Sequence, residues 1–158
     1  MGRSFAMGCN PTAGDSCTID SPVCPCRMAQ SIHNTSCQAA RCFVRHAEGV
    51  RLRDLHFICD KPDARPALIC LDTADLRVDG LELDKKVTAD WLIELQDVRE
   101  AVVRSTIPPR GTKTWARVAG AKSKVTHLLS DALRDVRNVV ELGEGVAQNA
   151  VSLRPVSE

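Results

Sequence analysis

The sequence has 158 residues, with 21 Lys or Arg and 20 Asp or Glu, which gives a formal net charge of +1. This length suits one ordinary domain with a sizeable core, and the balanced charge gives no electrostatic basis for binding nucleic acid or an anionic membrane. No apolar run approaches the ~18 residues of a membrane-spanning helix, and the N-terminus lacks the continuous apolar stretch of a secretory signal.

Residues 1–42 differ in composition from the rest of the chain, being rich in Ser, Pro, Gly and Cys. They show no sustained period of about 2 or about 3.6 residues, which predicts an irregular or disordered Cys-rich segment. The cysteines in it are Cys9, Cys17, Cys24, Cys26, Cys37 and Cys42. Three interpretations stay open: a disulfide framework, a zinc site, or a segment foreign to the native fold. Zinc fits least, because only one residue separates Cys24 from Cys26 and structural sites usually leave about two to four. We expect no metal and no cofactor.

From Phe43 onward a short apolar run returns at a constant interval. The four runs are FVRHAE from Phe43, ALICLD from Ala67, WLIELQ from Trp91 and WARVAG from Trp115. A fixed period of about 24 residues indicates a stacked repeat, and short runs rich in Leu, Ile and Val are typical of strands in a buried parallel sheet. In strict register the four first residues would form one ladder of side chains along the stack.

That strict register has a cost, because it would place Arg45 and Arg117 level with inward isoleucines. Burying an unpaired guanidinium in an apolar interior is unfavourable. The alternatives are reversed faces or a one-residue slip of the outer runs, which would flip every side chain. For the last run the slip would turn Ala116 and Val118 inward.

A second apolar pattern lies between these runs, with members at i, i+2, i+5 and i+7. It comprises Val50, Leu52, Leu55 and Phe57, then Leu76, Val78, Leu81 and Leu83, and more weakly Ala101, Val103, Thr106 and Pro108. The step of two predicts inward residues on a strand, and the step of three predicts a corner at Arg53-Asp54 and at Asp79-Gly80. Each unit thus alternates strands with turns, and we predict an all-β fold, a parallel β-helix with a partial solenoid of about four to five coils over residues 43–145.

Two loops between the predicted coils carry cations, at residues 61–66 and 108–113, and prolines keep both from regular structure. They supply the candidate substrate-binding residues, for a binding face toward acidic sugars. These residues are Lys61, Asp63, Arg65, Arg110 and Lys113. The alternative is that both loops are ordinary solvated connections.

The C-terminal part leaves helix and strand open over residues 125–142. Apolar residues recur there at a spacing of three to four, and Ser123 and Gly143 could start and end a helix. The run from Val139 to Gly143 instead looks like another coil strand, about 24 residues after the Trp115 run. Residues 146–158 show little pattern and are predicted to be a frayed tail.

The phrase RHAEGVRLRDLHFICDKPDARPALICLDTADLRVDGLEL, from Arg45 to Leu83, resembles the C-terminal coils of polygalacturonase-type glycoside hydrolases. These pectin-degrading proteins are right-handed parallel β-helices, typically extracellular or periplasmic. The resemblance covers roughly residues 43–145 and implies a right-handed solenoid and hydrolysis of acidic plant polysaccharides. The chain does not contain the family's Asn-Thr-Asp, Asp-Asp, Gly-His-Gly or Arg-x-Lys motifs, so no catalytic residue is predicted.

We therefore expect a terminal fragment of a β-helix glycoside hydrolase-like protein of the pectin class that is not catalytic by itself. An acidic polysaccharide is the expected partner, with neither nucleic acid nor membrane, and open solenoid ends would allow self-association. The alternative is a non-enzymatic Cys-rich interaction or carbohydrate-binding module on a β-solenoid scaffold. A pectinase-like enzyme with a rebuilt site is the third hypothesis.

Overall fold

A computed structural model describes residues 17–20, 30–33, 36–37, 42–57, 59, 62–129, 133 and 135–154. Strands dominate this part of the chain, which contains no α-helix and therefore no helix long and apolar enough to cross a membrane. The strands are β1 (Cys17–Asp20), β2 (Gln30–His33), β3 (Ser36–Cys37), β4 (Cys42–Glu48), β5 (Val50–Phe57), β6 (Leu68–Leu83), β7 (Trp91–Gln96), β8 (Arg99–Ile107), β9 (Thr114–Ala119), β10 (Lys124–Leu129), β11 (Asn138–Leu142) and β12 (Val151–Arg154).

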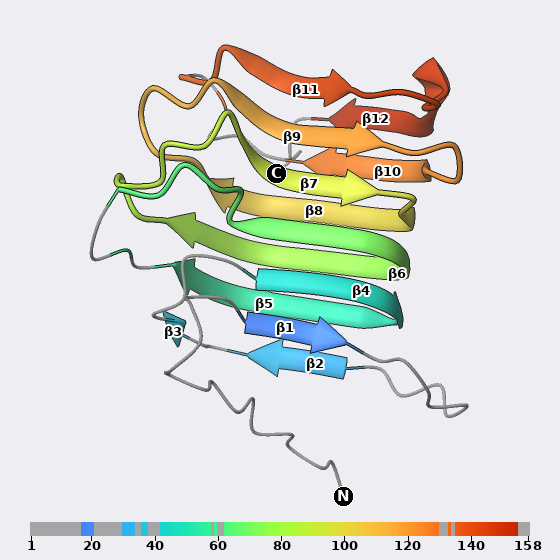
Figure 1. Cartoon of the computed structure of the whole chain (residues 1–158), viewed down its shortest axis with the longest axis horizontal. Helices are drawn as coiled ribbons and strands as arrows, with labels where there is room; N and C mark the ends of the chain where they lie inside the picture. The colour runs from blue at the N-terminus through green and yellow to red at the C-terminus, as the bar shows by residue number, and fades with distance from the viewer. Residues whose placement is uncertain are drawn as a thin grey trace, which may run out of the picture.

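The strands stack in two columns that run in opposite directions and meet at one corner (Figure 1). The first column holds β4, the first half of β6, β7, β9 and β11, and the second holds β5, the second half of β6, β8, β10 and β12. All neighbours within a column pair in parallel. The predicted parallel β-helix is thus confirmed, as a β-solenoid of about four turns.

The register corrects the ladder expected from strictly equal spacing. Val44 lies opposite Cys70, followed by Leu95, Val118 and Leu142, so the turns differ in length, the first being the longest and the third the shortest. Phe43, Ala67, Trp91 and Trp115 consequently do not form one ladder: Phe43 lies opposite Ile69 and Trp91 opposite Thr114. Turn length varies because the connecting loops differ, while the inward face of each strand must stay apolar.

The slip alternative is confirmed for the last of the four runs. Ala116 and Val118 are fully buried, while Arg117 between them faces outward and lies opposite Glu94. The two arginines that strict register would have buried are therefore on the outer face. Burial of a continuous apolar column decides the register against equal spacing.

The second column bears out the spacing of i, i+2, i+5 and i+7. Leu52, Val78 and Val103 lie opposite one another and are buried, and so are Leu55 and Leu81 on the far side of the corner. That corner has left-handed backbone at Asp54, Gly80 and Ser105, with φ of 50°, 77° and 55°. A change of direction at these positions explains why the inward positions skip one residue.

A second corner joins the two columns, and it repeats a left-handed conformation in every turn. One such row contains His46, Asp72, Asp97 and Gly120. A Cβ at Gly120 would lie 2.8 Å from the backbone nitrogen of Asp97 and would also meet its Oδ1, so only glycine fits there. Asp97 Oδ1 accepts a hydrogen bond from the backbone N–H of Lys122 at 3.0 Å, which fixes the next turn.

Short strands at the beginning of the chain correct part of the prediction for residues 1–42. β1 pairs with β4, and β2 and β3 pair with β5, all in parallel. The unpaired backbone groups at the edge of β4 and β5 can recruit a segment that has no apolar period of its own, which is why the pattern missed these strands. The rest of residues 1–41 lies outside the described residues, and with it the choice among the three interpretations of the cysteines.

The C-terminal part is settled in favour of strands, and the expected frayed tail is wrong through Arg154. Lys124–Leu129 and Asn138–Leu142 are the strands β10 and β11, and Val140 lies opposite Ala116 as in another coil. After a 3-10 turn at Gln148–Ala150, β12 pairs in parallel with β10. The edge of β10 supplies the hydrogen-bonding partners that the weak pattern of this segment did not reveal.

Candidate functional site

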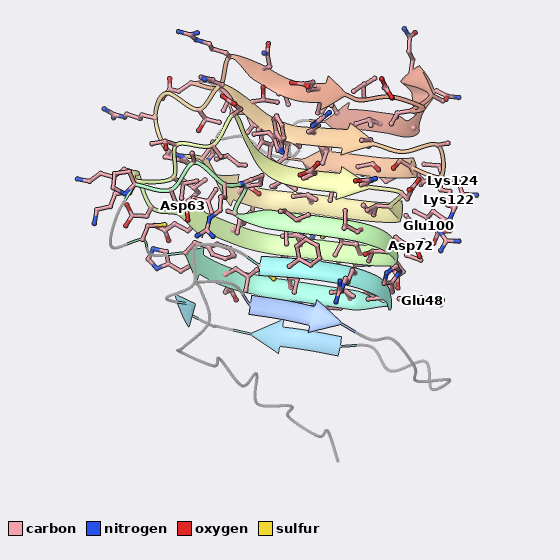
Figure 2. The ribbon with its side chains drawn as sticks, viewed as in Figure 1. Glu48, Asp63, Asp72, Glu100, Lys122 and Lys124 are labelled. Carbon is pink, nitrogen blue, oxygen red and sulfur yellow. The ribbon has the colours of Figure 1, made fainter. Side chains whose placement is uncertain are left out.

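Among the loop residues expected to bind acidic sugars, the described ones include two cations that are held in ion pairs. Asp63 and Arg65 bind each other: Arg65 Nη2 donates to Asp63 Oδ2 at 2.6 Å and Arg65 Nε to Oδ1 at 2.8 Å. Lys113 donates to Asp90 Oδ1 at 2.5 Å, and Arg110 is exposed in its loop. Lys61 lies outside the described residues. Asp63 stacks on the loop at residues 84–90 and lies on the side opposite the corner between the columns (Figure 2).

The corner between the columns carries a row of exposed charges. Figure 2 shows Asp72 and Glu100 lower on this corner and Lys122 and Lys124 higher on it. The hydrogen bond from the His46 ring, 3.1 Å between Nδ1 and Asp72 Oδ2, lowers the pKa of the Asp72 carboxyl. These groups stand on a convex edge open to water. The described residues contain no group of His, Cys, Asp or Glu that could hold a metal ion.

The outer face of the first column holds an ion-pair ladder. Arg117 lies between Glu94 and Glu141, with N–O distances of 4.0 and 3.7 Å, and its guanidinium covers the Trp91 ring at 4.6 Å from the ring centre. Trp91 Nε1 donates to Glu94 Oε2 at 3.4 Å. Each charge in this cluster already has a partner of opposite sign, and Arg117 occupies the aromatic face that a sugar ring would need.

The outer face of the second column is hollowed by a depression of about 140 Å³. It crosses three successive turns, and arginines make up most of its charged lining. The lining residues are Arg51, Leu52, Arg53, Arg77, Val78, Asp79, Val102 and Arg104. In register Arg51 lies opposite Arg77 and then Val102, while Arg53 lies opposite Asp79 and then Arg104.

Two carboxylates hold two of these four arginines. Arg51 donates to Asp75 Oδ2 at 2.7 Å and to the Asp75 carbonyl at 2.8 Å, and Arg104 donates to Asp79 Oδ2 at 2.5 Å. The hydrogen bond from Arg51 lowers the pKa of the Asp75 carboxyl, so Asp75 stays charged at neutral pH. Four guanidiniums against these two carboxylates leave an excess of two positive charges around the depression. This arrangement of guanidiniums suits an oxyanion, because guanidinium pairs well with carboxylate, sulfate and phosphate.

Neither described thiol with a shifted pKa is suited to nucleophilic chemistry. Cys70 is fully buried in the core and Cys59 nearly so, and burial raises the pKa of both thiols. A thiol kept protonated in an apolar interior is unreactive, as expected from the position of both residues in or beside strands.

Sequence reasoning missed the arginine-lined depression. The arginines that line it alternate with the buried residues of the i, i+2 pattern. The pattern therefore predicts that Arg51 and Arg53 point outward from one strand. The matching i, i+2, i+5, i+7 patterns align Val50 with Leu76 and therefore Arg51 with Arg77, and β5 and β6 pair in this register. What the sequence did not show is that these outward side chains surround a depression.

Comparisons with known proteins gave no match: no family model, no curated protein and no solved structure matches this chain. The resemblance to polygalacturonase-type hydrolases therefore stays a prediction. The fold and its outer faces define the class of the molecule, a parallel β-solenoid with a basic depression on the outer face of its second column.

Proposed function

We propose that this chain is part of a β-helix protein of the glycoside hydrolase type, and that it binds an acidic polysaccharide of the pectin class without cleaving it. The observation that carries this proposal is the depression on the second column, where Arg51, Arg53, Arg77 and Arg104 face one open surface. A polymer with regularly spaced carboxylates complements guanidiniums that are distributed over three successive turns of the solenoid. The resemblance in the sequence supports the same ligand class.

The non-catalytic part of the proposal rests on the carboxylates around the depression. Hydrolysis with inversion needs a carboxylic acid and a carboxylate base about 6.5–9.5 Å apart and able to exchange protons. Asp75 is bound to Arg51 and its pKa is lowered, so it is not suited to be a general acid near neutral pH, and the Asp79 carboxylate is engaged by Arg104. The chain therefore supplies a binding surface to a larger protein.

Titration calorimetry with polygalacturonate at low ionic strength, together with a reducing-end assay, tests this function. We expect the chain to bind the polymer, to bind fully methyl-esterified pectin more weakly, and to release no reducing ends. Binding should weaken as salt is raised, because the Debye length falls from about 30 Å at 0.01 M to about 8 Å at 0.15 M. Equal binding of the esterified polymer would refute the role of charge, and released reducing ends would refute the non-catalytic role.

A further inference from the structure

The four arginines of the depression differ in how much hydrogen-bonding capacity they have left. Arg51 is the most constrained: it donates to Asp75 twice and also to the Val50 carbonyl at 3.3 Å, and its side chain is only 25% exposed. Arg104 is bound to Asp79. These two guanidiniums are fixed parts of the wall, with their charge already compensated.

The other two arginines are held less tightly. Arg77 has a single, longer contact, 3.6 Å between its Nε and Asp75 Oδ1, and its side chain is 58% exposed. Arg53 is exposed and makes no hydrogen bond or ion pair within the part of the chain that the structure describes. Arg53 is therefore uncompensated among the described residues, and Arg77 shares the Asp75 carboxylate with Arg51 through the longer of the two contacts.

The register places these two arginines as diagonal neighbours on adjacent turns. Arg53 lies opposite Asp79 on β6, two residues beyond Arg77, and both side chains face outward into the same depression. Residues that differ by one strand of about 4.8 Å and two positions of about 3.3 Å each are about 8 Å apart, which long side chains can bridge. Arg51 and Asp79 occupy the other diagonal of the same square, and Val102 and Arg104 follow Arg77 and Asp79 on the next turn.

We infer that Arg53 and Arg77 together bind one oxyanion group, the carboxylate of an acidic sugar, while Asp75 and Asp79 hold Arg51 and Arg104 in place beside it. The choice of a sugar carboxylate rests on the proposed function. The pairing of the two arginines on one anion rests on the register and the free donors alone. Asp79 is the one carboxylate that lines the depression, so it opposes anion binding by repulsion while it fixes Arg104.

Arginine side-chain NMR with acetate as the probe tests the two-arginine site directly on the full chain. Acetate should shift the Nε–Hε signals of Arg53 and Arg77 in a saturable way, relative to chloride at equal ionic strength. Arg110 is the matched control, because it is an exposed arginine in the loop at residues 108–113, away from the depression, and its signal should not move. Absence of an acetate-specific shift, or an equal shift at Arg110, would overturn the site.

Polygalacturonate affinity in three variants then separates the site from the proposed function. Arg53→Gln and Arg77→Gln should each weaken binding about tenfold, as expected for loss of a charge-assisted hydrogen bond. Arg110→Gln removes the same charge elsewhere and should change the affinity less than twofold. Equal losses in all three variants would overturn the site and leave the polysaccharide function standing. If the wild-type chain does not bind polygalacturonate but shows the acetate shifts, the proposed function is refuted and the oxyanion site stands.

Asp79→Asn gives a test with the opposite sign. Removing its charge should tighten polygalacturonate binding several-fold, because the carboxylate that repels the ligand is gone and Arg104 is released toward it. A variant that binds more weakly would show that fixing Arg104 matters more than the repulsion, and would overturn this assignment of roles.

Discussion

Left-handed backbone at single residues makes the turns of this solenoid possible. In the corner between the columns it recurs at Gly49, Asp75, Glu100 and Val125, with φ of 72°, 48°, 59° and 54°. Glycine and aspartate adopt this region readily, whereas a β-branched side chain does so only with strain. Val125 is therefore the residue where the repeated corner geometry and the local preference of the amino acid disagree.

Replacing Val125 with glycine should stabilise the protein by about 1 kcal/mol, because the strain of a left-handed L-residue costs about 1–2 kcal/mol and glycine gives part of it back as chain entropy. Val125 is 48% exposed, so little apolar burial is lost. Chemical denaturation measures the change. Ile107→Gly is the matched control, since Ile107 is an exposed β-branched strand residue without positive φ, and it should destabilise. A destabilised Val125→Gly would show that the corner is not strained.

At the scale of an element, charged side chains tie neighbouring turns together where the backbone changes direction. The Arg51 guanidinium on β5 reaches both the carbonyl and the carboxylate of Asp75 on the next turn. His46 and Asp72 make a similar contact between the same two turns. Both carboxyl groups have a lowered pKa, first through the hydrogen bond that each accepts. We call these two contacts the corner ion pairs, and the stability that they contribute consequently depends on pH.

Acid should weaken the corner ion pairs. A carboxyl with a lowered pKa in the folded state contributes stability above the unfolded value of about 3.9, and this contribution is lost as the pH falls through the folded pKa. We expect the free energy of unfolding to fall below about pH 4 in the wild type. Asp75→Asn should be less stable at pH 7 and should lose less stability between pH 4 and pH 2, as measured by urea denaturation at each pH.

The control for that experiment is Asp135→Asn. Asp135 is exposed and makes no hydrogen bond or ion pair with the described residues, so its removal should leave the acid dependence unchanged. If the free energy of unfolding of Asp75→Asn depends on pH as in the wild type, the Arg51–Asp75 contact contributes no pH-dependent stability. The acid dependence would then come from other residues.

At the scale of the whole molecule, each turn packs mainly on the turns above and below it. The buried column that contains Leu55, Leu81 and Thr106 runs through the middle of the stack. Two other inward columns are open in the last turn: Leu142, opposite Val118, is 41% exposed, and Leu153, opposite Leu128, is 53% exposed. Stability in such a quasi-one-dimensional stack is a sum over neighbouring turns, so position along the axis decides the effect of a mutation.

Truncating a leucine should therefore have very different effects in the middle and at the last described turn. Leu81→Ala should destabilise by about 2–4 kcal/mol, because it leaves a cavity among buried side chains. Leu142→Ala should cost less than about 1 kcal/mol, since much of that side chain is already in water. Denaturant unfolding of both variants measures the difference. Comparable losses would indicate that the last turn is covered in solution.

Much of this architecture could be predicted from the residues. The i, i+2, i+5, i+7 pattern located the inward side chains and the corner from Val50 to Leu83. Burial of alternating residues gives the steps of two, and the change of direction gives the step of three. The aligned patterns also place Arg51 beside Arg77, as the structure has them. The depression itself could not be predicted, because side-chain conformations decide which outward arginines pair with a carboxylate and which face an open space. The cationic loops, for which the sequence left a binding face and an ordinary solvated connection open, hold ion pairs at Arg65 and at Lys113.

The sequence by itself determined the class of fold, the two strand columns and their apolar interior, because apolar residues recur at inward positions in each turn. Only the tertiary structure decided the register of the first column and which charged side chains meet. Turns of unequal length replace the equal spacing of the apolar runs, because the connecting loops absorb the difference while each strand keeps its apolar side inward. That register sets Arg117 between two glutamates. In the second column the side-chain contacts leave Arg53 and Arg77 facing an open depression.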